Sequence, residues 1–212
     1  IRMYGEILQA GWADEAKRKT YYEHIFQESE RLTRLINNVL SLARITKSQQ
    51  TTLAAKPVSV QELVVATKDS TANAINQAGF TLEMLYDEIL EPVHVLADVD
   101  AFAQIMINLV DNGLKFSGPT GNIIQLGTRR QADFVEFWVR DYGPGIDAGQ
   151  LKKIFRMFYR IENELTRETS GTGIGIGLAL VSELIDQMHA EIDVYNCDPG
   201  TEFRVRLPVT NR

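Results

Sequence analysis

A helix-length run at residues 104–117 constrains the fold more than any other part of the sequence. Ile105 and Leu109 belong to a set of apolar positions that recur close to the helical period, which predicts a mostly buried helix. Asn108 and Asn112 interrupt this apolar surface one turn apart, so both carboxamides lie on the same side of the helix. Their oxygens can converge on one hydrated cation, or both side chains can simply be hydrogen-bonded within a buried helix.

An acid at a strand end and a run of glycines follow this helix in the chain. Asp141 comes after the strand-like run 134–139 and leads into a turn that contains Gly143 and Gly145. A carboxylate in that place can accept a hydrogen bond from an exocyclic amine. The glycines at 171–177 then open directly into an apolar helix. Glycine allows close backbone approach, and a helix N-terminus offers free N–H groups to phosphate.

The order of four patterns makes this signal specific. The chain carries Asn-x-x-x-Asn-x-x-Lys from residue 108, Asp-x-Gly-x-Gly from 141, Phe-x-x-Phe-Tyr-Arg from 155 and Gly-x-Gly-x-Gly from 171. This combination resembles the catalytic ATP-binding domain of sensor histidine kinases, whose fold is shared by gyrase, Hsp90, histidine kinases and MutL. The resemblance covers essentially the whole chain, because the helical region at the start is similar to the dimerisation hairpin of that family.

The resemblance implies ATP and Mg²⁺ as cofactors. The residues that it assigns to nucleotide binding are Asn108, Asn112, Lys115, Phe116, Asp141, Gly143, Gly145, Ile146, Gly171, Gly173, Gly175, Gly177 and Leu178. Asn108 and Asn112 are the implied metal ligands, and Asp141 is the implied acceptor for the adenine amino group. Asn108, Lys115 and Arg160 are the implied catalytic residues. Arg160 would bring its guanidinium to the γ-phosphate, and a solvated loop arginine is the alternative interpretation.

Two further segments fit the same picture. Phe155 and Phe158 are expected to anchor their segment in the core rather than to contact a ligand. The polar residues 161–170 are bounded by glycines and are predicted to form a mobile lid over the triphosphate. Closure that excludes water favours phosphoryl transfer, because positioning and charge neutralisation provide most of its catalysis.

Three departures from the family pattern are visible. Gly113 stands in place of the usual alanine, which costs the helix ~1 kcal/mol but keeps the position small beside a ligand. The glycine run carries one extra Gly-Thr unit at 171–172. The glycines that contact phosphate can therefore be assigned in two ways, which differ by one repeat. The pair of glycines expected after Met188 and His189 is missing, so the local turn there is predicted to differ.

Composition narrows the class of protein. The 212 residues are 44% hydrophobic and 24% charged, as in ordinary globular chains that are long enough for one or two domains. The formal net charge of −6 argues against general nucleic-acid binding, because clustered Lys and Arg usually meet a phosphate backbone. Cys197 is the single cysteine, so no internal disulfide forms, and no run approaches the length of a membrane-spanning helix.

Residues 1–47 are predicted to form a truncated antiparallel helical hairpin, 48–55 a polar linker and 56–212 the catalytic ATP-binding domain. The first helix has an apolar stripe made of Ile1, Tyr4, Leu8 and Trp12. The second has apolar heptad positions, widened on one side, at Ile25, Leu32, Leu35, Ile36, Val39, Leu42 and Ala43. So broad a face needs further helices, and the resemblance implies a homodimer with a four-helix bundle. Packing on the following domain of the same chain is the alternative.

The second domain is predicted to be a two-layer α/β sandwich, which makes the whole chain α+β. Strands are expected at residues 58–60, 80–85, 94–97, 122–129, 134–140, 192–195 and 203–207. The last two strands form a hairpin around the turn Asp198-Pro199-Gly200. Helices at 62–78, 104–117 and 178–185 are expected to cover one face of a mixed, mostly antiparallel sheet.

The resemblance implies transfer of the ATP γ-phosphoryl to a histidine and then to an aspartate of a response-regulator receiver domain. In that family an acid, and then a segment with a basic residue and a proline, follow the acceptor; His24, His94 and His189 all lack this context. We therefore expect the acceptor upstream of residue 1. The chain would then be the cytoplasmic portion of a sensor protein that reaches the membrane only through upstream regions.

Two other functions are compatible with parts of the pattern. Water-directed ATPases of the same wider fold, such as gyrase, Hsp90-type chaperones and mismatch-repair ATPases, place a glutamate at the position of Asn108. An amide cannot serve as that general base. A degenerate ATP-binding scaffold would act through its helical bundle alone, but the complete set of Asn108, Asn112, Lys115, Asp141 and the glycine run argues against it.

Overall fold

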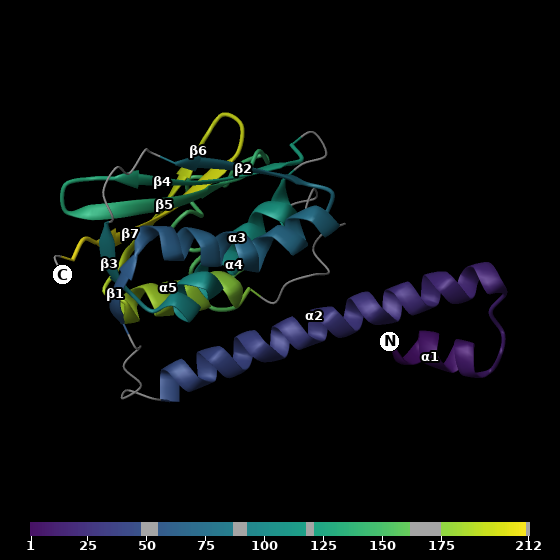
Figure 1. Ribbon diagram of the computed structural model, residues 1–212. Helices are drawn as coiled ribbons and strands as arrows, with labels where there is room; N and C mark the ends of the chain where they lie inside the picture. Colours follow the sequence, from purple (N-terminus) through teal and green to yellow (C-terminus); the bar gives the residue numbers. More distant parts are fainter. Residues whose placement is uncertain (48–54, 87–92, 118–120, 162–174, 211–212) are drawn as a thin grey trace.

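The computed structural model describes residues 1–47, 55–86, 93–117, 121–161 and 175–210, and Figure 1 shows how they are arranged. The helices are α1 (Arg2–Gln9), α2 (Glu15–Lys47), α3 (Val60–Gln77), α4 (Val99–Phe116) and α5 (Gly177–Gln187). The strands are β1 (Lys56–Ser59), β2 (Thr81–Tyr86), β3 (His94–Ala97), β4 (Ile123–Arg130), β5 (Phe134–Arg140), β6 (Glu191–Asn196) and β7 (Thr201–Pro208). A helical hairpin comes first, and an α/β domain follows it.

Five strands form one mixed sheet in the order β2-β4-β5-β7-β6. β2 pairs with β4 in parallel, while the pairs β4–β5, β5–β7 and β6–β7 are antiparallel. Helices α3, α4 and α5 all lie on one face of this sheet, below it in Figure 1. The structure confirms the predicted two-layer sandwich, with a mixed sheet and three covering helices.

β1 and β3 do not join the large sheet but form an antiparallel pair of their own, from Lys56 opposite Ala97 to Ser59 opposite His94. Ser59 ends β1 because its side chain caps α3, where its Oγ accepts a hydrogen bond from the Glu62 N–H at 3.1 Å. The strand is therefore only four residues long. The sequence pattern located both strands but predicted a single sheet.

α4 lies in the centre of the core. It begins earlier than predicted, at Val99, because Asp98 caps it through a hydrogen bond from the Ala101 N–H to Asp98 Oδ1 at 3.0 Å. Phe102 packs edge-on against Phe137 of β5, with ring centroids 4.7 Å apart, and both side chains are buried. Each such burial stabilises the fold by about 1.5–3 kcal/mol. This packing holds the N-terminal end of α4 against the sheet, and the buried Leu109 and Val110 continue the contact toward the polar residues of its C-terminal half.

α5 ends in a left-handed turn although the expected glycines are missing. His189 has a φ of 52°, and the next N–H, that of Ala190, donates to the carbonyl of Ile185 at 3.0 Å. Glycine usually occupies such a position because it has no Cβ. His189 therefore adopts the left-handed conformation without the advantage that glycine has there, and the prediction that this turn differs from that of the family stays a prediction.

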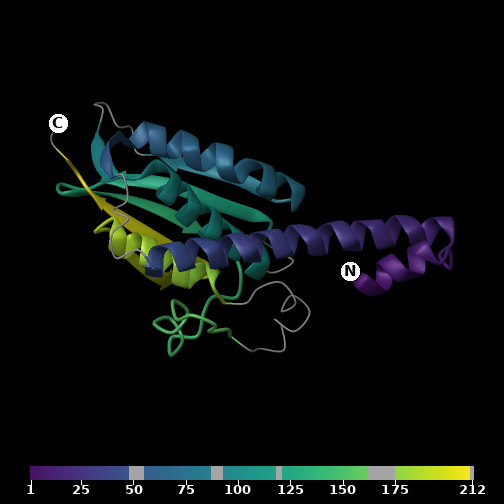
Figure 2. The same cartoon turned by 90° about the horizontal axis from the view of Figure 1, so that it is seen from below.

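The first two helices form a hairpin, in which Tyr4 of α1 stacks on Tyr21 of α2 with ring centroids 5.0 Å apart. The predicted stripe of the first helix is wrong at Trp12, which follows the end of α1 and is 81% exposed. Figure 2 shows the end of α2 that leads to the α/β domain running beside α5. An apolar set on α2, 47–67% exposed, consists of Tyr22, Phe26, Leu32, Ile36 and Leu40 and is called the exposed α2 stripe below.

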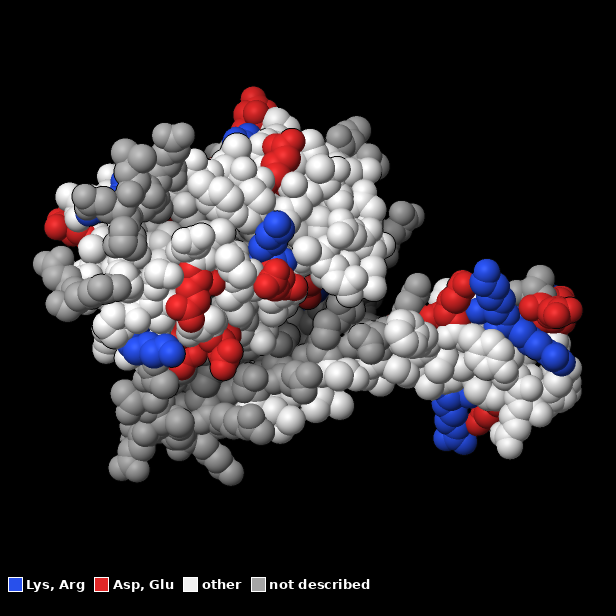
Figure 3. All heavy atoms as spheres, in the orientation of Figure 1, with Lys and Arg blue, Asp and Glu red and all other residues white. Residues whose placement is uncertain are grey.

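Charged side chains at the free end of the hairpin pair locally. Figure 3 shows acidic and basic groups close together there; Arg2 pairs with Glu6 at 2.8 Å, and Lys17 with Asp14 at 3.1 Å. These groups are exposed, so the two pairs contribute little to stability. Over the described ranges, no helix combines the length and the apolar character that crossing a lipid bilayer requires.

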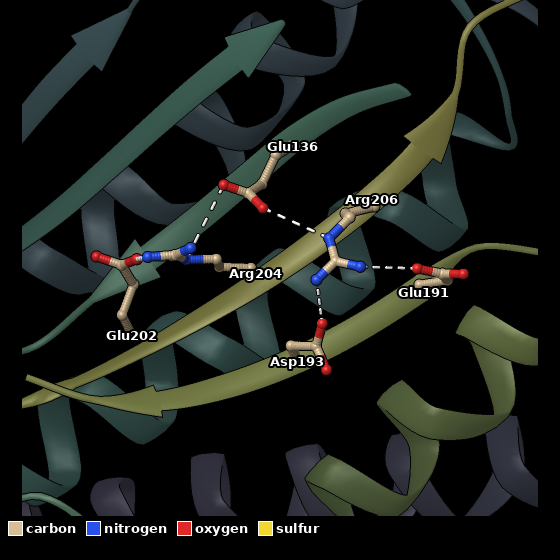
Figure 4. Close-up of polar contacts among 6 residues, drawn as sticks. All are labelled: Glu136, Glu191, Asp193, Glu202, Arg204 and Arg206. Carbon is tan, nitrogen blue, oxygen red and sulfur yellow. Dashed lines mark hydrogen bonds and ion pairs between the residues drawn. The ribbon is translucent and has the colours of Figure 1, made fainter. Parts of the chain in front are cut away.

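The face of the large sheet away from the helices carries the ion-pair cluster drawn in Figure 4. Its members are Glu136, Glu191, Asp193, Glu202, Arg204 and Arg206. The Glu136 side chain is 7% exposed, and its oxygens lie 3.9 Å from Arg204 Nε and 3.5 Å from Arg206 Nε. Arg206 also contacts Glu191 at 2.8 Å and the Asp193 carboxylate. The cluster links β5, β7 and β6 through paired charges.

Candidate functional site

The Asn108 side chain has a fixed orientation on α4. It is 7% exposed, and its Nδ2 donates a hydrogen bond to the carbonyl of Gln104 at 2.7 Å. Its oxygen faces the beginning of α5, because a Cβ added at Gly177 would lie 2.9 Å from Asn108 Oδ1. A residue with a side chain at Gly177 would therefore push against this oxygen. The structure thus brings together the Asn helix and the last glycine of the glycine run.

Asn112, one turn further along α4, has a side-chain amide that the protein does not satisfy. Its Nδ2 is buried and has no hydrogen-bond partner among the described residues. A buried polar group in that condition costs about 1–3 kcal/mol. The amide offers donors and an oxygen acceptor, so it suits either a phosphate oxygen or, through its oxygen, a hard cation. Such an unpaired group is where a bound ligand would supply the missing contact.

The donor set fits Mg²⁺ bound together with phosphate. Oxygen ligands are what Mg²⁺ prefers, and it commonly keeps waters and uses only one or two protein groups beside substrate phosphates. In the part of the chain that the structure describes, no three His, Cys, Asp or Glu side chains gather into a metal-binding group. Asn108 and Asn112, on one side of α4, are compatible with this kind of site.

Asp141 follows β5 and is held by the neighbouring strand. The residue is 6% exposed, and its Oδ1 accepts hydrogen bonds from the N–H of Gly143 at 2.8 Å and of Thr201 at 3.2 Å. Among the described residues both contacts use Oδ1, which leaves Oδ2 to accept from a ligand. Burial raises the pKa of the Asp141 carboxyl, while the hydrogen bonds from Gly143 and Thr201 and the nearby Arg140 charge oppose the rise.

Gly113 explains how α4 comes so close to Asp141. A Cβ at this position would lie 2.8 Å from Cδ1 of Ile124 and 3.5 Å from Cβ of Asp141. The Ile124 side chain therefore occupies the space that a methyl group would need. This contact with β4 explains why glycine stands here in place of the family's usual alanine.

The glycine-rich turn after Asp141 packs against the end of α4. A Cβ at Gly143 would lie 2.4 Å from the carbonyl oxygen of Phe116, so the two backbones meet where no side chain fits. Phe116 is 49% exposed beside this contact. Gly145 has a φ of 78°, a conformation that glycine adopts without strain. Ile146, the next residue, is half-buried and packs against the core.

The glycine run is described only at its end, because residues 162–174 lie outside the described ranges. Gly171, Gly173 and nearly all of the predicted lid fall in that interval, and their roles stay predictions. Gly175 has a φ of 75°, and its carbonyl accepts a hydrogen bond from the Phe158 N–H at 2.9 Å. Leu178, in the first turn of α5, is half-buried and packs against the core.

The expected anchoring by two phenylalanines holds for only one of them. Phe155 packs edge-on against Phe203 of β7, with ring centroids 6.4 Å apart. Phe158 is 67% exposed and has a φ of 61°, so the prediction that it is buried was wrong. The backbone of Phe158, rather than its ring, is tied to Gly175. The motif therefore links this segment to the glycine run by a main-chain hydrogen bond.

Both predicted basic site residues have partners within the chain. Lys115 is half-buried in the last turn of α4, next to Phe116 and three positions after Asn112. Arg160 is exposed and follows the segment that contacts Gly175. Their roles toward phosphate stay predictions.

Three residues of the β6–β7 hairpin hold the turn after Asp141, and sequence reasoning missed all of them as part of the site. They are Asn196, Gly200 and Thr201. The turn Asp198-Pro199-Gly200 was recognised, but its contacts run across 50 to 60 positions of the chain. No local pattern in the sequence reports such a contact.

Comparison with known proteins identifies close similarities. Residues 97–211, more than half of the chain, match the family described as histidine kinase-, DNA gyrase B- and HSP90-like ATPase. The chain is 32% identical over 209 residues to the probable sensor histidine kinase TcrY of Mycobacterium tuberculosis, an alignment that covers 99% of this chain and 42% of TcrY. The chain thus spans less than half the length of this curated relative.

Solved structures show the same fold. Full-length ShkA in complex with AMPPNP is similar with a TM-score of 0.72 and 25% identity, over 92% of this chain and 40% of ShkA. The histidine kinase ThkA in complex with the response regulator protein TrrA is similar with a TM-score of 0.71 and 22% identity, over 98% of this chain and 57% of ThkA. The second likeness bears on the fold alone.

Proposed function

Because the chain belongs to the family of histidine kinase-, DNA gyrase B- and HSP90-like ATPases, we propose that it is the ATP-binding kinase core of a two-component sensor histidine kinase. The core would transfer the γ-phosphoryl of ATP to a histidine outside residues 1–212, and the phosphoryl would then pass to an aspartate of a response regulator. The observation that carries this proposal is the unsatisfied amide of Asn112 beside the fixed oxygen of Asn108.

The residues of the site divide between the two ends of ATP. Asn108 and Asn112 would hold Mg²⁺, which neutralises charge on the phosphates when bound. The N-terminus of α5 after Gly177 would offer free backbone N–H groups to the same phosphates. At the other end, Oδ2 of Asp141 would accept a hydrogen bond from the adenine amino group, with Gly143 allowing close approach of the base.

The identity of residue 108 separates this proposal from a water-directed ATPase. Activation of water needs a general base, and the amide of Asn108 cannot take a proton in that role. Its nitrogen is moreover occupied by the carbonyl of Gln104. A histidine acceptor brings its own nucleophile, so positioning and charge neutralisation suffice. Slow hydrolysis beside efficient transfer to histidine follows from this arrangement.

We further propose a homodimer through the hairpin. The exposed α2 stripe presents apolar side chains at helical spacing along most of α2, a pattern that usually marks an interface. The five side chains of the stripe stay 47–67% exposed in the single chain, although α2 also contacts α5. Leu32→Glu should produce monomers that still bind ATP, measured by sedimentation. A parent chain that sediments as a monomer at high concentration would contradict the dimer.

The remaining parts of the proposal concern the whole protein. ThkA was solved in complex with the response regulator protein TrrA, and a receiver domain is the partner that we propose for this chain as well. We place the chain on the cytoplasmic side, with any membrane contact made by regions outside residues 1–212.

Phosphotransfer tests the proposal. The chain is incubated with γ-labelled ATP, alone and with a longer form of the protein that contains the upstream helix but carries a disabled glycine run. We expect no label on the chain itself and label on the longer form. Asp141→Asn is the matched control and should lose that transfer. Label on His24, His94 or His189, or fast release of phosphate without transfer, would contradict the proposal.

A further inference from the structure

The turn that leaves β5 at residues 141–146 is held at both ends by one neighbouring element. That element is the end of the β6–β7 hairpin, residues 196–201, which lies far away in the sequence. The N–H of Cys197 donates to the carbonyl of Gly200 at 2.8 Å and closes the hairpin turn. The hairpin end is therefore a compact platform on which the turn rests.

The first end of the turn is held through Asp141. Its backbone N–H donates to the carbonyl of Thr201 at 2.9 Å, and the Thr201 N–H donates to Oδ1 of Asp141 at 3.2 Å. Gly200 has a φ of 107°, and a Cβ there would lie 1.9 Å from the carbonyl oxygen of Asp141. No other residue type allows this approach. The platform thus sets the position of the carboxylate.

The second end of the turn is held by a single side chain, that of Asn196. Its Oδ1 accepts a hydrogen bond from the N–H of Ile146 at 2.8 Å, and its Nδ2 donates to the carbonyl of the same residue at 2.5 Å. The amide thereby replaces the pairing that a neighbouring strand would supply. Gly145, just before, is close to the same oxygen, 3.1 Å from where its Cβ would be.

Asn196 suits this task for two reasons. An amide carries an NH₂ donor group and a carbonyl acceptor in one plane, which matches the C=O and N–H of one backbone residue. An ionised carboxylate would only accept, and a hydroxyl would reach one group at a time. Asn196 is also the last residue of β6, paired with Thr201 in the hairpin, so its backbone is fixed. The side chain is exposed, so the net stabilisation from its two hydrogen bonds is modest.

We propose that Asn196 is a positioning residue for base recognition: by clamping Ile146 to the platform that also holds Asp141, it fixes the turn against which adenine binds. This inference rests on the proposed function, because the base is assigned to the turn at 141–146 there. Asn196 itself need not touch the nucleotide. Its effect should appear in the choice of base rather than in the binding of the triphosphate.

Calorimetry with two Mg-nucleotides tests the proposal. ATP carries the exocyclic amine that Asp141 is proposed to accept from, whereas ITP has a carbonyl in its place. The ratio of the two affinities therefore reports how well the turn presents the carboxylate. We expect Asn196→Ala to lower ATP affinity by about tenfold and ITP affinity much less, so that the ratio collapses. Asn196→Ser, which can make one of the two hydrogen bonds, should recover part of the ratio.

A matched control is Asn73→Ala on α3, an exposed asparagine remote in sequence from the turn, which should leave the ratio and both affinities unchanged. Thermal unfolding checks that each variant is folded, and Asn196→Ser carries the test if Asn196→Ala does not fold. Equal losses for ATP and ITP, or an unchanged ratio, would overturn the inference while the proposed function stands. A parent chain that binds neither nucleotide would overturn both.

Discussion

Two sets of polar side chains lie on opposite faces of the same sheet, and they differ in how far the chain satisfies them. On the outer face, Arg206 contacts three carboxylates, and Glu136 has an arginine on each side (Figure 4). On the helix face, Asn112 keeps a buried nitrogen without a partner in the described structure, and Asp141 uses one of its two oxygens. Charge alone does not mark a functional site here.

Whether a polar group has a partner within the chain separates groups that stabilise the fold from groups that are available to a ligand. A charge that is paired within the chain, as Glu136 is, needs no ligand to complete its contacts. A buried amide without a partner destabilises the free protein, and that cost is recovered when a ligand supplies the missing contact. The under-satisfied face is therefore where we place ATP and Mg²⁺, and the contrast can be tested from both sides.

The largest expected effect is that of Asp141→Asn on nucleotide affinity. An amide in place of the carboxylate presents a donor where the adenine amine needs an acceptor, which should cost about 1–3 kcal/mol. Titration calorimetry with Mg-ATP measures this loss directly. If the variant binds as tightly as the parent, Asp141 does not contact the base.

Asn112→Ala should come next. Removing one of the two proposed metal ligands should weaken Mg-ATP binding by about tenfold while leaving metal-free binding close to that of the parent. Affinities measured with and without Mg²⁺ separate the loss of metal binding from a loss of nucleotide binding. An equal response to Mg²⁺ in the variant and the parent would remove Asn112 from the metal site.

The outer face should respond in the opposite way. Glu136→Gln keeps the shape of the side chain but removes the buried charge between Arg204 and Arg206, which should lower the free energy of unfolding by about 1 kcal/mol, the net value of a typical polar contact. ATP affinity should not change, because the cluster faces away from the helices. Urea unfolding and calorimetry on the same sample measure both quantities. A loss of affinity as large as that of Asp141→Asn would erase the contrast between the faces.

The smallest expected effect is a pH dependence of stability. Burial raises the pKa of Asp141 in the folded chain, so the folded state holds this proton more tightly than the unfolded chain does. The stabilisation that this carboxyl gives the folded chain is therefore fully present below its ordinary pKa of 3.8. It is lost as pH rises through the folded-state pKa.

In the absence of nucleotide, Asp141→Asn should therefore gain stability relative to the parent as pH rises across that interval. Urea unfolding at a series of pH values measures the difference between the two proteins. A difference that does not depend on pH would show that burial does not disfavour the charged carboxylate.

Local sequence signals predicted the elements of the fold well. The strands at 94–97 and 134–140 lie where alternation placed them, because each is bounded by residues that end a strand. The start of α4 was missed because the cap at Asp98 lies ahead of the apolar run. Trp12 was misplaced because periodicity continued past the point where the helix ends. In both cases the error lies at the end of a helix, because capping residues rather than the apolar period determine where a helix begins and ends.

The residues of the candidate site also divide into those that a local pattern predicts and those that it does not. Its motif residues on α4, at the end of β5 and at the start of α5 were visible because each falls in a short local pattern. Asn196 and Gly200 were not visible, because their roles depend on which hairpin packs against the turn after Asp141. The separate pair of β1 and β3 escaped prediction for the same reason. Pairing between distant segments is set by tertiary packing, which no local pattern encodes.

NMR of the Asn112 side-chain amide during titration with Mg-AMPPNP tests whether the nucleotide binds at this residue. The resonance is assigned by its absence from the spectrum of Asn112→Ala, and the amide of Asn73 serves as an internal reference. We expect the Asn112 signal to shift along the binding curve measured by calorimetry while the Asn73 signal stays in place. Nucleotide binding that leaves the Asn112 amide unperturbed, or no binding at all, would contradict this expectation.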